Sequence, residues 1–89
     1  MLERNITIQN KLGLHARAAV KFVNLANRFT SAVKIEKDGN EIDGKSILGI
    51  LTLAAIQGTE ITLKISGKDE ARALKALVTL IENRFDEKE

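Results

Sequence analysis

The sequence predicts an α+β fold, a two-layer open-faced β-sandwich in which a four-stranded antiparallel sheet carries three helices on one face. The spacing of apolar residues changes repeatedly between strand and helix periods, in the order β-α-β-β-α-β-α. Each expected strand has one apolar face, so one side of the sheet is covered and the other faces solvent. With 89 residues and one core, we expect residues 1–89 to form a single domain.

The first strand and the first helix have the clearest patterns. Residues 2–9 alternate between apolar and polar side chains, as in a half-buried strand. Residues 10–14 are expected to form a loop, with Gly13 its most permissive point. The spacing then becomes helical, from Ala16 to near Phe29. The inward face of this helix consists of Ala19, Phe22, Val23 and Ala26.

A β-hairpin is expected in the middle of the chain. Val33 and Ile35 alternate with charged residues, which indicates a strand. Asp38-Gly39 then favours a tight type I′ turn, because that turn needs positive φ at both central positions. Residues 41–43 complete the hairpin as a short strand, with Ile42 inward.

The second half adds two helices and a strand. Ser46 can cap a short helix over residues 47–55. Residues 60–66 alternate again, with Ile61, Leu63 and Ile65 inward. Asp69 can cap the last helix, which continues to the charged tail at residues 86–89. Its apolar positions are Leu74, Leu77, Val78, Ile81 and Phe85.

Composition argues against several classes of function. The net charge is only +2, with both signs intermixed, and Trp and Tyr are absent. Nucleic-acid binding is therefore disfavoured, although a small nucleic-acid-binding α+β domain is an alternative. The chain has no Cys and one His, so thiol chemistry and a structural zinc site lack their ligands. No apolar stretch suits a signal peptide or a membrane span, and we expect a cytoplasmic protein.

The one histidine, His15, is expected at or beside the N-cap of the first helix. The first turn of a helix leaves N–H groups unpaired and attracts anions. Arg17 can fold back toward the same anion, and neutral imidazole is a competent nucleophile. His15 could instead be a weak cap or a solvated side chain. No carboxylate lies near it in sequence, so triad hydrolase chemistry has no support.

Two segments resemble one known family. Gly13-Leu14-His15-Ala16-Arg17-Ala18-Ala19 resembles the active-site signature of HPr, the histidine-containing phosphocarrier of the bacterial phosphoenolpyruvate-dependent phosphotransferase system. Lys45-Ser46-Ile47-Leu48-Gly49 resembles the family's regulatory serine segment, and Gln57-Gly58-Thr59-Glu60 resembles the segment that leads into its last strand. The likeness extends over essentially the whole chain.

The resemblance implies a phosphocarrier without a cofactor and without net turnover of a small molecule. His15 would accept a phosphoryl group, at Nδ1, from Enzyme I and donate it to IIA-type acceptors, and Arg17 would clamp the phosphate. Ala18 stands where the family most often has Pro. Ala is compatible with the third helical position, so we expect the chemistry to survive with a less rigid turn.

The segment after Ser46 has two interpretations. Ser46 is a good helix cap, and the resemblance also makes it a regulatory phosphorylation site for a serine kinase or phosphorylase. Ile50, Leu53 and Ala54 can face the sheet. The remaining apolar residues would then form a docking surface, unless the tail or a loop covers them. The predicted docking residues are Ile47, Leu48, Gly49 and Leu51, with Lys21, Asn24, Asn27 and Arg28 as a polar rim.

Two alternatives stay within the family. The chain could be a regulatory adaptor that is controlled through Ser46. Family members used only as regulators, however, have no histidine at the position of His15. It could also serve the nitrogen-related branch, which signals and does not transport sugar. In each case we expect a monomer that does not insert into a membrane.

Overall fold

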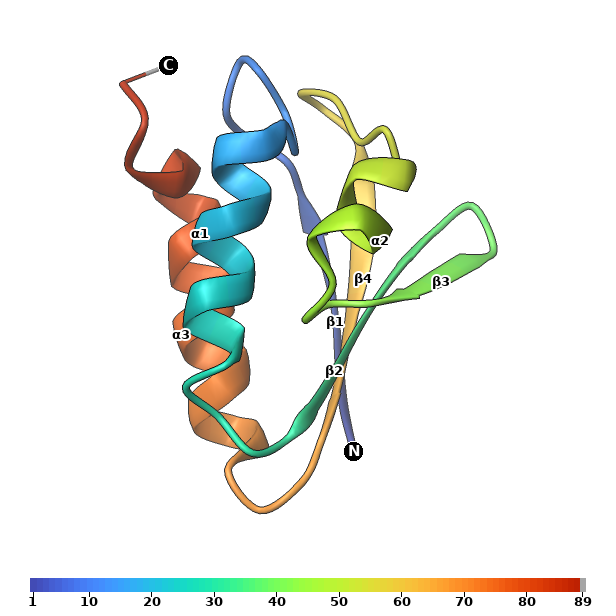
Figure 1. Cartoon of the computed structure of the whole chain (residues 1–89), viewed down its shortest axis with the longest axis vertical. Coiled ribbons are helices and arrows are strands. Elements are labelled where there is room, and N and C mark those ends of the chain that lie inside the picture. The colour runs from blue at the N-terminus through green and yellow to red at the C-terminus, as the bar shows by residue number, and fades with distance from the viewer. Residues whose placement is uncertain (89) are drawn as a thin grey trace.

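The computed structural model describes residues 1–88, and it has the element order that the sequence predicts (Figure 1). The strands are β1 (Leu2–Thr7), β2 (Ala32–Lys37), β3 (Asn40–Asp43) and β4 (Glu60–Ser66). The helices are α1 (Ala16–Ala26), α2 (Ile47–Thr52) and α3 (Glu70–Glu82), followed by a single tight turn, η1 (Arg84–Asp86).

The four strands form one antiparallel sheet in the order β1-β4-β2-β3. The inward residues of β4 lie opposite inward residues of its neighbours: Ile61 faces Ile6 across the β1 pairing, and Leu63 faces Ile35 across the β2 pairing. This register keeps the apolar side chains on one face of the sheet. The opposite face is polar, and there the Lys64 ammonium lies 2.7 Å from the Glu36 carboxylate.

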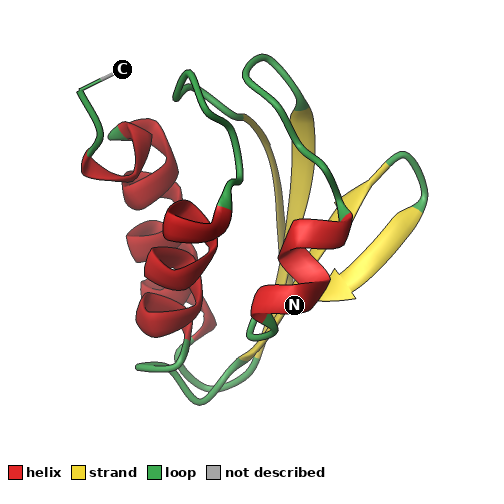
Figure 2. Ribbon diagram, turned by 45° about the horizontal axis from the view of Figure 1, so that its top comes forward, coloured by secondary structure: helices red, strands yellow, loops and turns green. Residues whose placement is uncertain are grey.

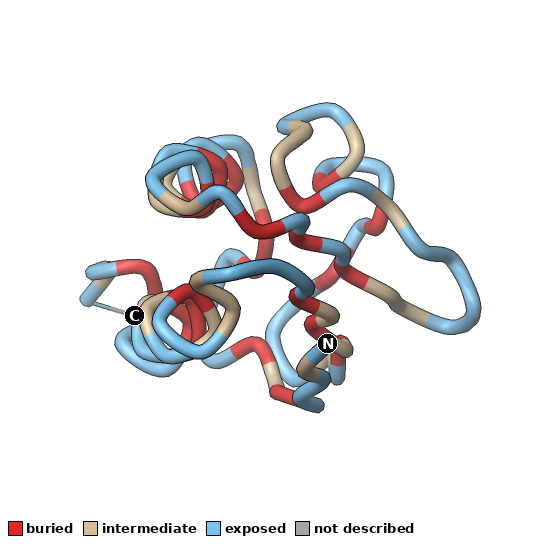
Figure 3. The backbone as a smooth tube through the Cα atoms, turned by 90° about the horizontal axis from the view of Figure 1, so that it is seen from below, coloured by how far each residue is buried: buried red, intermediate tan, exposed pale blue. Residues whose placement is uncertain are grey.

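The helices cover one face of the sheet, as the sequence predicts. Helices α1 and α3 lie side by side, and α2 packs against α1 and β3 (Figures 1 and 2). Buried backbone segments gather between the two layers (Figure 3). The largest fully buried side chains come from both layers and include Phe22, Ile35, Ile50, Leu63 and Leu77. Within residues 1–88, no helix is long and apolar enough to cross a membrane.

The Asp38-Gly39 turn is confirmed. Asp38 has φ 51° and Gly39 has φ 84°, as a type I′ turn requires at its two central positions. The predicted inward face of α1 is also buried, although α1 ends at Ala26 and not near Phe29. The Phe29 N–H bonds to the Ala26 carbonyl three residues back, so the chain leaves α1 through a tighter turn.

Helix α2 is shorter than predicted, and the prediction that Ala54 faces the sheet is wrong. The helix ends at Thr52, and Ala54 has φ 51°, in the left-handed region. This change of backbone direction leaves Ala54 exposed and buries Ala55 in its place. Ile50 and Leu53 are buried against the sheet, as expected.

Phe85 is buried, but it does not lie on the last helix. Helix α3 ends at Glu82, and Arg84, Phe85 and Asp86 all have positive φ. This left-handed turn directs the Phe85 ring back into the core. Lys21 on α1 fixes the turn, because its ammonium donates to the Phe85 carbonyl oxygen at 2.7 Å. Phe85 therefore reaches the core through a turn, and not through the longer helix that its spacing from Ile81 predicts.

Asp69 is at the N-cap position of α3, but its carboxylate does not cap that helix. It accepts hydrogen bonds from the Thr30 N–H at 2.9 Å, the Ser31 N–H at 3.0 Å and the Ser31 hydroxyl. Asp69 therefore joins the turn after α1 to the start of α3. The bond from the Ser31 hydroxyl, followed by that from the Thr30 N–H, lowers the pKa of Asp69 to about 2.

Asp69→Asn should reduce stability and also change how stability depends on pH. A depressed folded-state pKa stabilises the fold above the unfolded-state pKa, and that stabilisation is lost as pH falls through the folded-state value. We expect wild-type protein to lose stability between about pH 4 and about pH 2, and Asp69→Asn to lose less over that window. Urea unfolding across this range measures both effects.

Asp38→Asn is the matched control, because Asp38 lies in an exposed turn and makes no hydrogen bond or ion pair with residues 1–88. Its pH dependence should match that of wild type. If wild type and Asp69→Asn lose the same free energy of unfolding as the pH falls, Asp69 is not the stabilising carboxylate.

Candidate functional site

His15 is the N-cap residue of α1, as predicted. Its backbone is extended, with φ −75° and ψ 177°, and its carbonyl accepts from the Ala19 N–H at 2.9 Å. The side chain makes no capping bond. The N–H groups of Ala16, Arg17 and Ala18 have no hydrogen-bond partner among residues 1–88. These donors stand at the positive end of the helix dipole and suit an anion.

Gly13 allows the loop before α1 to pack closely against the chain after α2. Gly13 has φ +67°, and a Cβ there would lie 2.4 Å from the Ala55 carbonyl oxygen. The next residue, Leu14, is buried and donates its N–H to the same oxygen at 2.8 Å. Glycine is therefore required both by the backbone conformation and by the close approach. Together these contacts fix where His15 leaves the loop.

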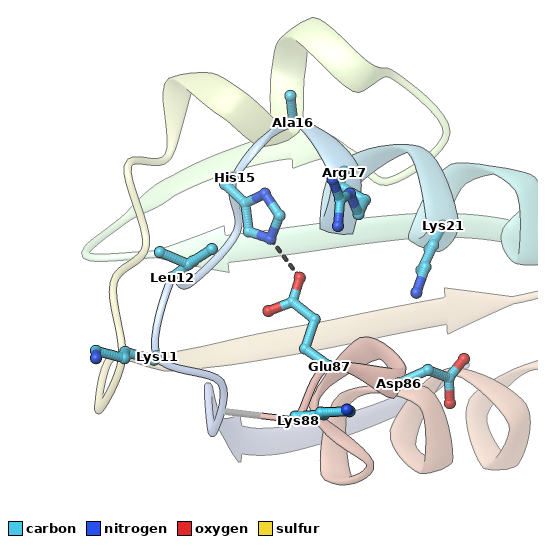
Figure 4. A pocket seen from close by; sticks show the side chains of 9 residues that line it. All are labelled: Lys11, Leu12, His15, Ala16, Arg17, Lys21, Asp86, Glu87 and Lys88. Carbon is cyan, nitrogen blue, oxygen red and sulfur yellow. Dashed lines mark hydrogen bonds and ion pairs between the residues drawn. The ribbon is translucent and has the colours of Figure 1, made fainter.

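The His15 ring borders an open hollow between the start of α1 and the C-terminal tail (Figure 4). The residues that line it are Lys11, Leu12, His15, Ala16, Arg17, Lys21, Asp86, Glu87 and Lys88. Four of these side chains are basic and two are carboxylates, so the hollow favours an anionic group.

Arg17 lies on the rim of this hollow and is exposed. It makes no hydrogen bond or ion pair with residues 1–88, so its guanidinium is available to an incoming group. Figure 4 shows Nδ1 of His15 on the side of the ring toward Arg17, and Nε2 on the side toward the tail. The two ring nitrogens therefore have different surroundings.

Glu87 lies against His15, and the sequence pattern does not reveal this contact. Its Oε2 contacts Nε2 of His15, and its Oε1 accepts from the Asn10 side-chain amide at 3.0 Å. Burial opposes ionisation of Glu87, but the hydrogen bonds from His15 and Asn10, together with the charge of Lys21, outweigh it and lower the pKa of this carboxyl. The two partners are 72 residues apart, so no local pattern could reveal the pair.

Ser46 is the N-cap of α2, as predicted, and its hydroxyl accepts from the Gly49 N–H at 3.0 Å. The Lys45 side chain does not bond to the Ser46 hydroxyl. Its ammonium donates to the Phe29 carbonyl oxygen at 2.8 Å. Gly49 lies close to the cap, since a Cβ there would be 3.2 Å from the Ser46 hydroxyl oxygen. A capping role for Ser46 is therefore confirmed.

The α2 residues that the core does not use are exposed. Leu48 is 76% exposed, Ile47 38% and Leu51 37%. The tail up to residue 88 runs toward His15 and leaves these three residues uncovered (Figure 1). We call Ile47, Leu48 and Leu51 the α2 patch.

Two further exposed apolar residues, Leu12 at 67% and Ile56 at 68%, lie in the two loops that meet beside His15. The sequence pattern does not reveal them, because isolated apolar residues in loops carry no periodic signal. Of the predicted rim, Asn24, Asn27 and Arg28 are exposed, whereas Lys21 is half-buried and bonds to the tail.

Comparisons with known proteins agree with this geometry. The family model described as "PTS HPr component phosphorylation site" matches residues 2–83. The phosphocarrier protein HPr of Cupriavidus necator is 52% identical over 89 residues, covering all of both chains. HPr of Pseudomonas aeruginosa is 53% identical over 85 residues, 94% of each chain. A crystal structure of HPr from Thermoanaerobacter tengcongensis, 47% identical, covers all of both chains with a TM-score of 0.96.

The fold and the site define a small α+β carrier type, in which a single histidine stands at a helix N-terminus beside an exposed apolar helix. The chain belongs to the HPr family of the phosphotransferase system. Similar structures include an HPr dimer from Thermoanaerobacter tengcongensis, at TM-score 0.79 and 48% identity over 98% of this chain and all of that one. The monomeric state expected from the sequence therefore stays a prediction.

Proposed function

We propose that this chain carries phosphoryl groups between proteins, accepting them on His15 from Enzyme I and donating them to IIA-type acceptors. The observation that supports this most is the position of the His15 ring, at the open N-terminus of α1 with Nδ1 toward Arg17. A nucleophile, unpaired N–H donors and a guanidinium are the parts that reversible transfer needs.

The surroundings of His15 suit transfer between two protein surfaces. The hollow is open and mostly basic, which would attract the phosphoryl group of a donor. It has no enclosed chamber for a small substrate, and among residues 1–88 no group of three His, Cys, Asp or Glu residues could hold a metal ion. The chemistry we propose uses no cofactor, and we place it in the cytoplasm.

His15→Ala should abolish phosphorylation by phosphoenolpyruvate and Enzyme I, because no other imidazole is present. Arg17→Ala should still be charged but should donate at least about 100-fold more slowly, because its contribution is electrostatic. Charging with radiolabelled phosphate, followed by transfer to a IIA protein, measures both steps.

Arg72→Ala is the matched control, since Arg72 is an exposed arginine on α3 and lies outside both the His15 hollow and the proposed docking surface. It should donate at the wild-type rate. A charged His15→Ala variant would refute the assignment of His15, and an Arg17→Ala variant as fast as Arg72→Ala would remove Arg17 from the mechanism.

The α2 patch, with Gly49, is proposed as the centre of the surface that Enzyme I and the IIA acceptors contact. Three observations support this: the patch is exposed, the tail leaves it uncovered, and helix α2 packs beside α1, whose N-cap residue is His15. An exposed apolar group of this kind is typical of a protein interface. Lys21, Asn24, Asn27 and Arg28 would form its polar rim.

Leu48→Asp should weaken Enzyme I binding by about 1–2 kcal/mol, because it places a charge in the middle of an apolar contact. The melting temperature should stay near that of wild type, since Leu48 packs little against the core. Thr79→Asp, which adds the same charge at an exposed position of α3, should bind normally. An unfolded Leu48→Asp variant would show that Leu48 belongs to the core.

We further propose that phosphorylation of Ser46 by a serine kinase, reversed by a phosphorylase, weakens docking without unfolding the protein. A phosphoserine adds about −1.5 to −2 charge. The N-terminus of α2 tolerates that charge, because its N–H donors and dipole favour an anion. A partner covering the adjacent α2 patch would have to desolvate it, which is unfavourable.

Ser46→Asp should therefore keep or slightly raise the melting temperature while raising the KM for Enzyme I. Ser46→Ala separates the two roles of this residue, because it removes the cap, which is worth about 1 kcal/mol, but adds no charge. It should melt earlier and transfer normally. Wild-type transfer by Ser46→Asp would leave Ser46 as a helix cap alone.

A further inference from the structure

We propose that Glu87 is a positioning residue for His15. Its carboxylate holds the proton on Nε2, which leaves the Nδ1 lone pair to attack phosphorus, and it stabilises the positively charged ring that forms when Nδ1 takes the phosphoryl group. This role rests on the proposed transfer at His15 and assigns to the C-terminal tail a part in that chemistry.

The tail is held in place by contacts of Phe85 and of Glu87 itself. Phe85 fills the core, and its carbonyl oxygen accepts from Lys21 at 2.7 Å. Asn10 is fully buried, and its side-chain amide donates to the Gly13 carbonyl at 2.8 Å and to Oε1 of Glu87 at 3.0 Å. One carboxylate oxygen is thereby fixed to the loop that carries His15, and the other contacts Nε2.

The identity of the partner decides the tautomer of His15. An ionised carboxylate can only accept hydrogen bonds, and the hydrogen bonds to Glu87 favour its ionised form. Nε2 must therefore be the nitrogen that carries the proton. In the neutral ring this leaves Nδ1 unprotonated, on the side of the ring toward Arg17 (Figure 4).

The transfer step balances with Glu87 as a spectator that keeps its negative charge. The Nδ1 lone pair forms the N–P bond, and the bond from phosphorus to the donor breaks with its electron pair leaving on the donor. Nε2 keeps its proton, so the ring becomes cationic. On donation the N–P electron pair returns to Nδ1, and a neutral ring leaves. A carboxylate at Nε2 favours the cationic ring from which donation occurs.

Of the charged residues that line the hollow within residues 1–88, only Glu87 places a carboxylate against the His15 ring. Lys11 comes from the loop, Arg17 and Lys21 from α1, and Lys88 from the tail. Four basic side chains disfavour a cationic ring. The second carboxylate, Asp86, lines the same hollow, but its side chain makes no hydrogen bond or ion pair with residues 1–88. Asp86→Asn is therefore a matched control for Glu87→Gln, since each removes one negative charge from this hollow.

Nitrogen-15 NMR of the His15 ring, at a pH where the imidazole is neutral, tests the tautomer directly. Wild type and Asp86→Asn should show one tautomer, with the proton on Nε2. Glu87→Gln should show a mixture, because an amide can either donate to Nε2 or accept from it. The same single tautomer in Glu87→Gln would overturn the proposal. This measurement needs no Enzyme I, so it holds whether or not His15 carries phosphate.

The second measurement is the rate of phosphoryl transfer. Glu87→Gln should transfer about 10-fold more slowly than Asp86→Asn, the effect typical of losing a partner that orients a histidine. An equal or faster rate for Glu87→Gln would overturn the positioning role. Failure of wild type itself to form phosphohistidine would instead overturn the proposed function.

Discussion

The hydrogen bond from the Leu14 N–H to the Ala55 carbonyl joins the chain before α1 to the chain after α2. It requires Gly13, whose absent Cβ leaves room for that carbonyl. Because the loop is fixed there, His15 begins α1 at a defined point. The same contact brings the segment after the α2 patch next to the histidine. This backbone contact, together with the packing of α2 beside α1, places the proposed reactive group relative to the proposed docking surface.

The C-terminal tail completes the site from the opposite side. A left-handed turn carries Phe85 into the core, and Lys21 holds that turn to α1. Glu87 then meets both Asn10 and His15. Contacts made for stability therefore also determine the surroundings of the imidazole. A change in the packing of Phe85 should therefore alter the contact between Glu87 and the His15 ring, even though Phe85 and His15 belong to different segments.

Local patterns were sufficient to predict most of the fold and part of the site. The period of apolar residues gave the order of strands and helices, and the turn residues Asp38 and Gly39 gave the hairpin. The start of α1 at His15 and the cap at Ser46 also followed from signals within a few residues. Each of these features depends on neighbours in sequence, which is why a single sequence contains it.

The features that sequence analysis missed depend on distant partners or on backbone reversals. Asp69 bonds to Ser31, 38 residues away, in preference to its own helix. The spacing of Phe85 from the other apolar residues suits a longer helix equally well. In the structure the helix ends at Glu82, and three residues of positive φ follow. The contact between Glu87 and His15 depends on that same turn. Such pairings arise only when the core has assembled, because tertiary packing overrides local preference.

The most direct test of the central claim is to identify which nitrogen of His15 carries phosphorus. Phosphorylated protein can be examined by nitrogen-15 and phosphorus-31 NMR, in which the N–P coupling identifies the bonded atom. We expect the phosphoryl group on Nδ1, because Nε2 is engaged by Glu87 and Nδ1 is on the side toward Arg17. Phosphate on Nε2, or on any residue other than His15, would contradict the mechanism proposed for this site.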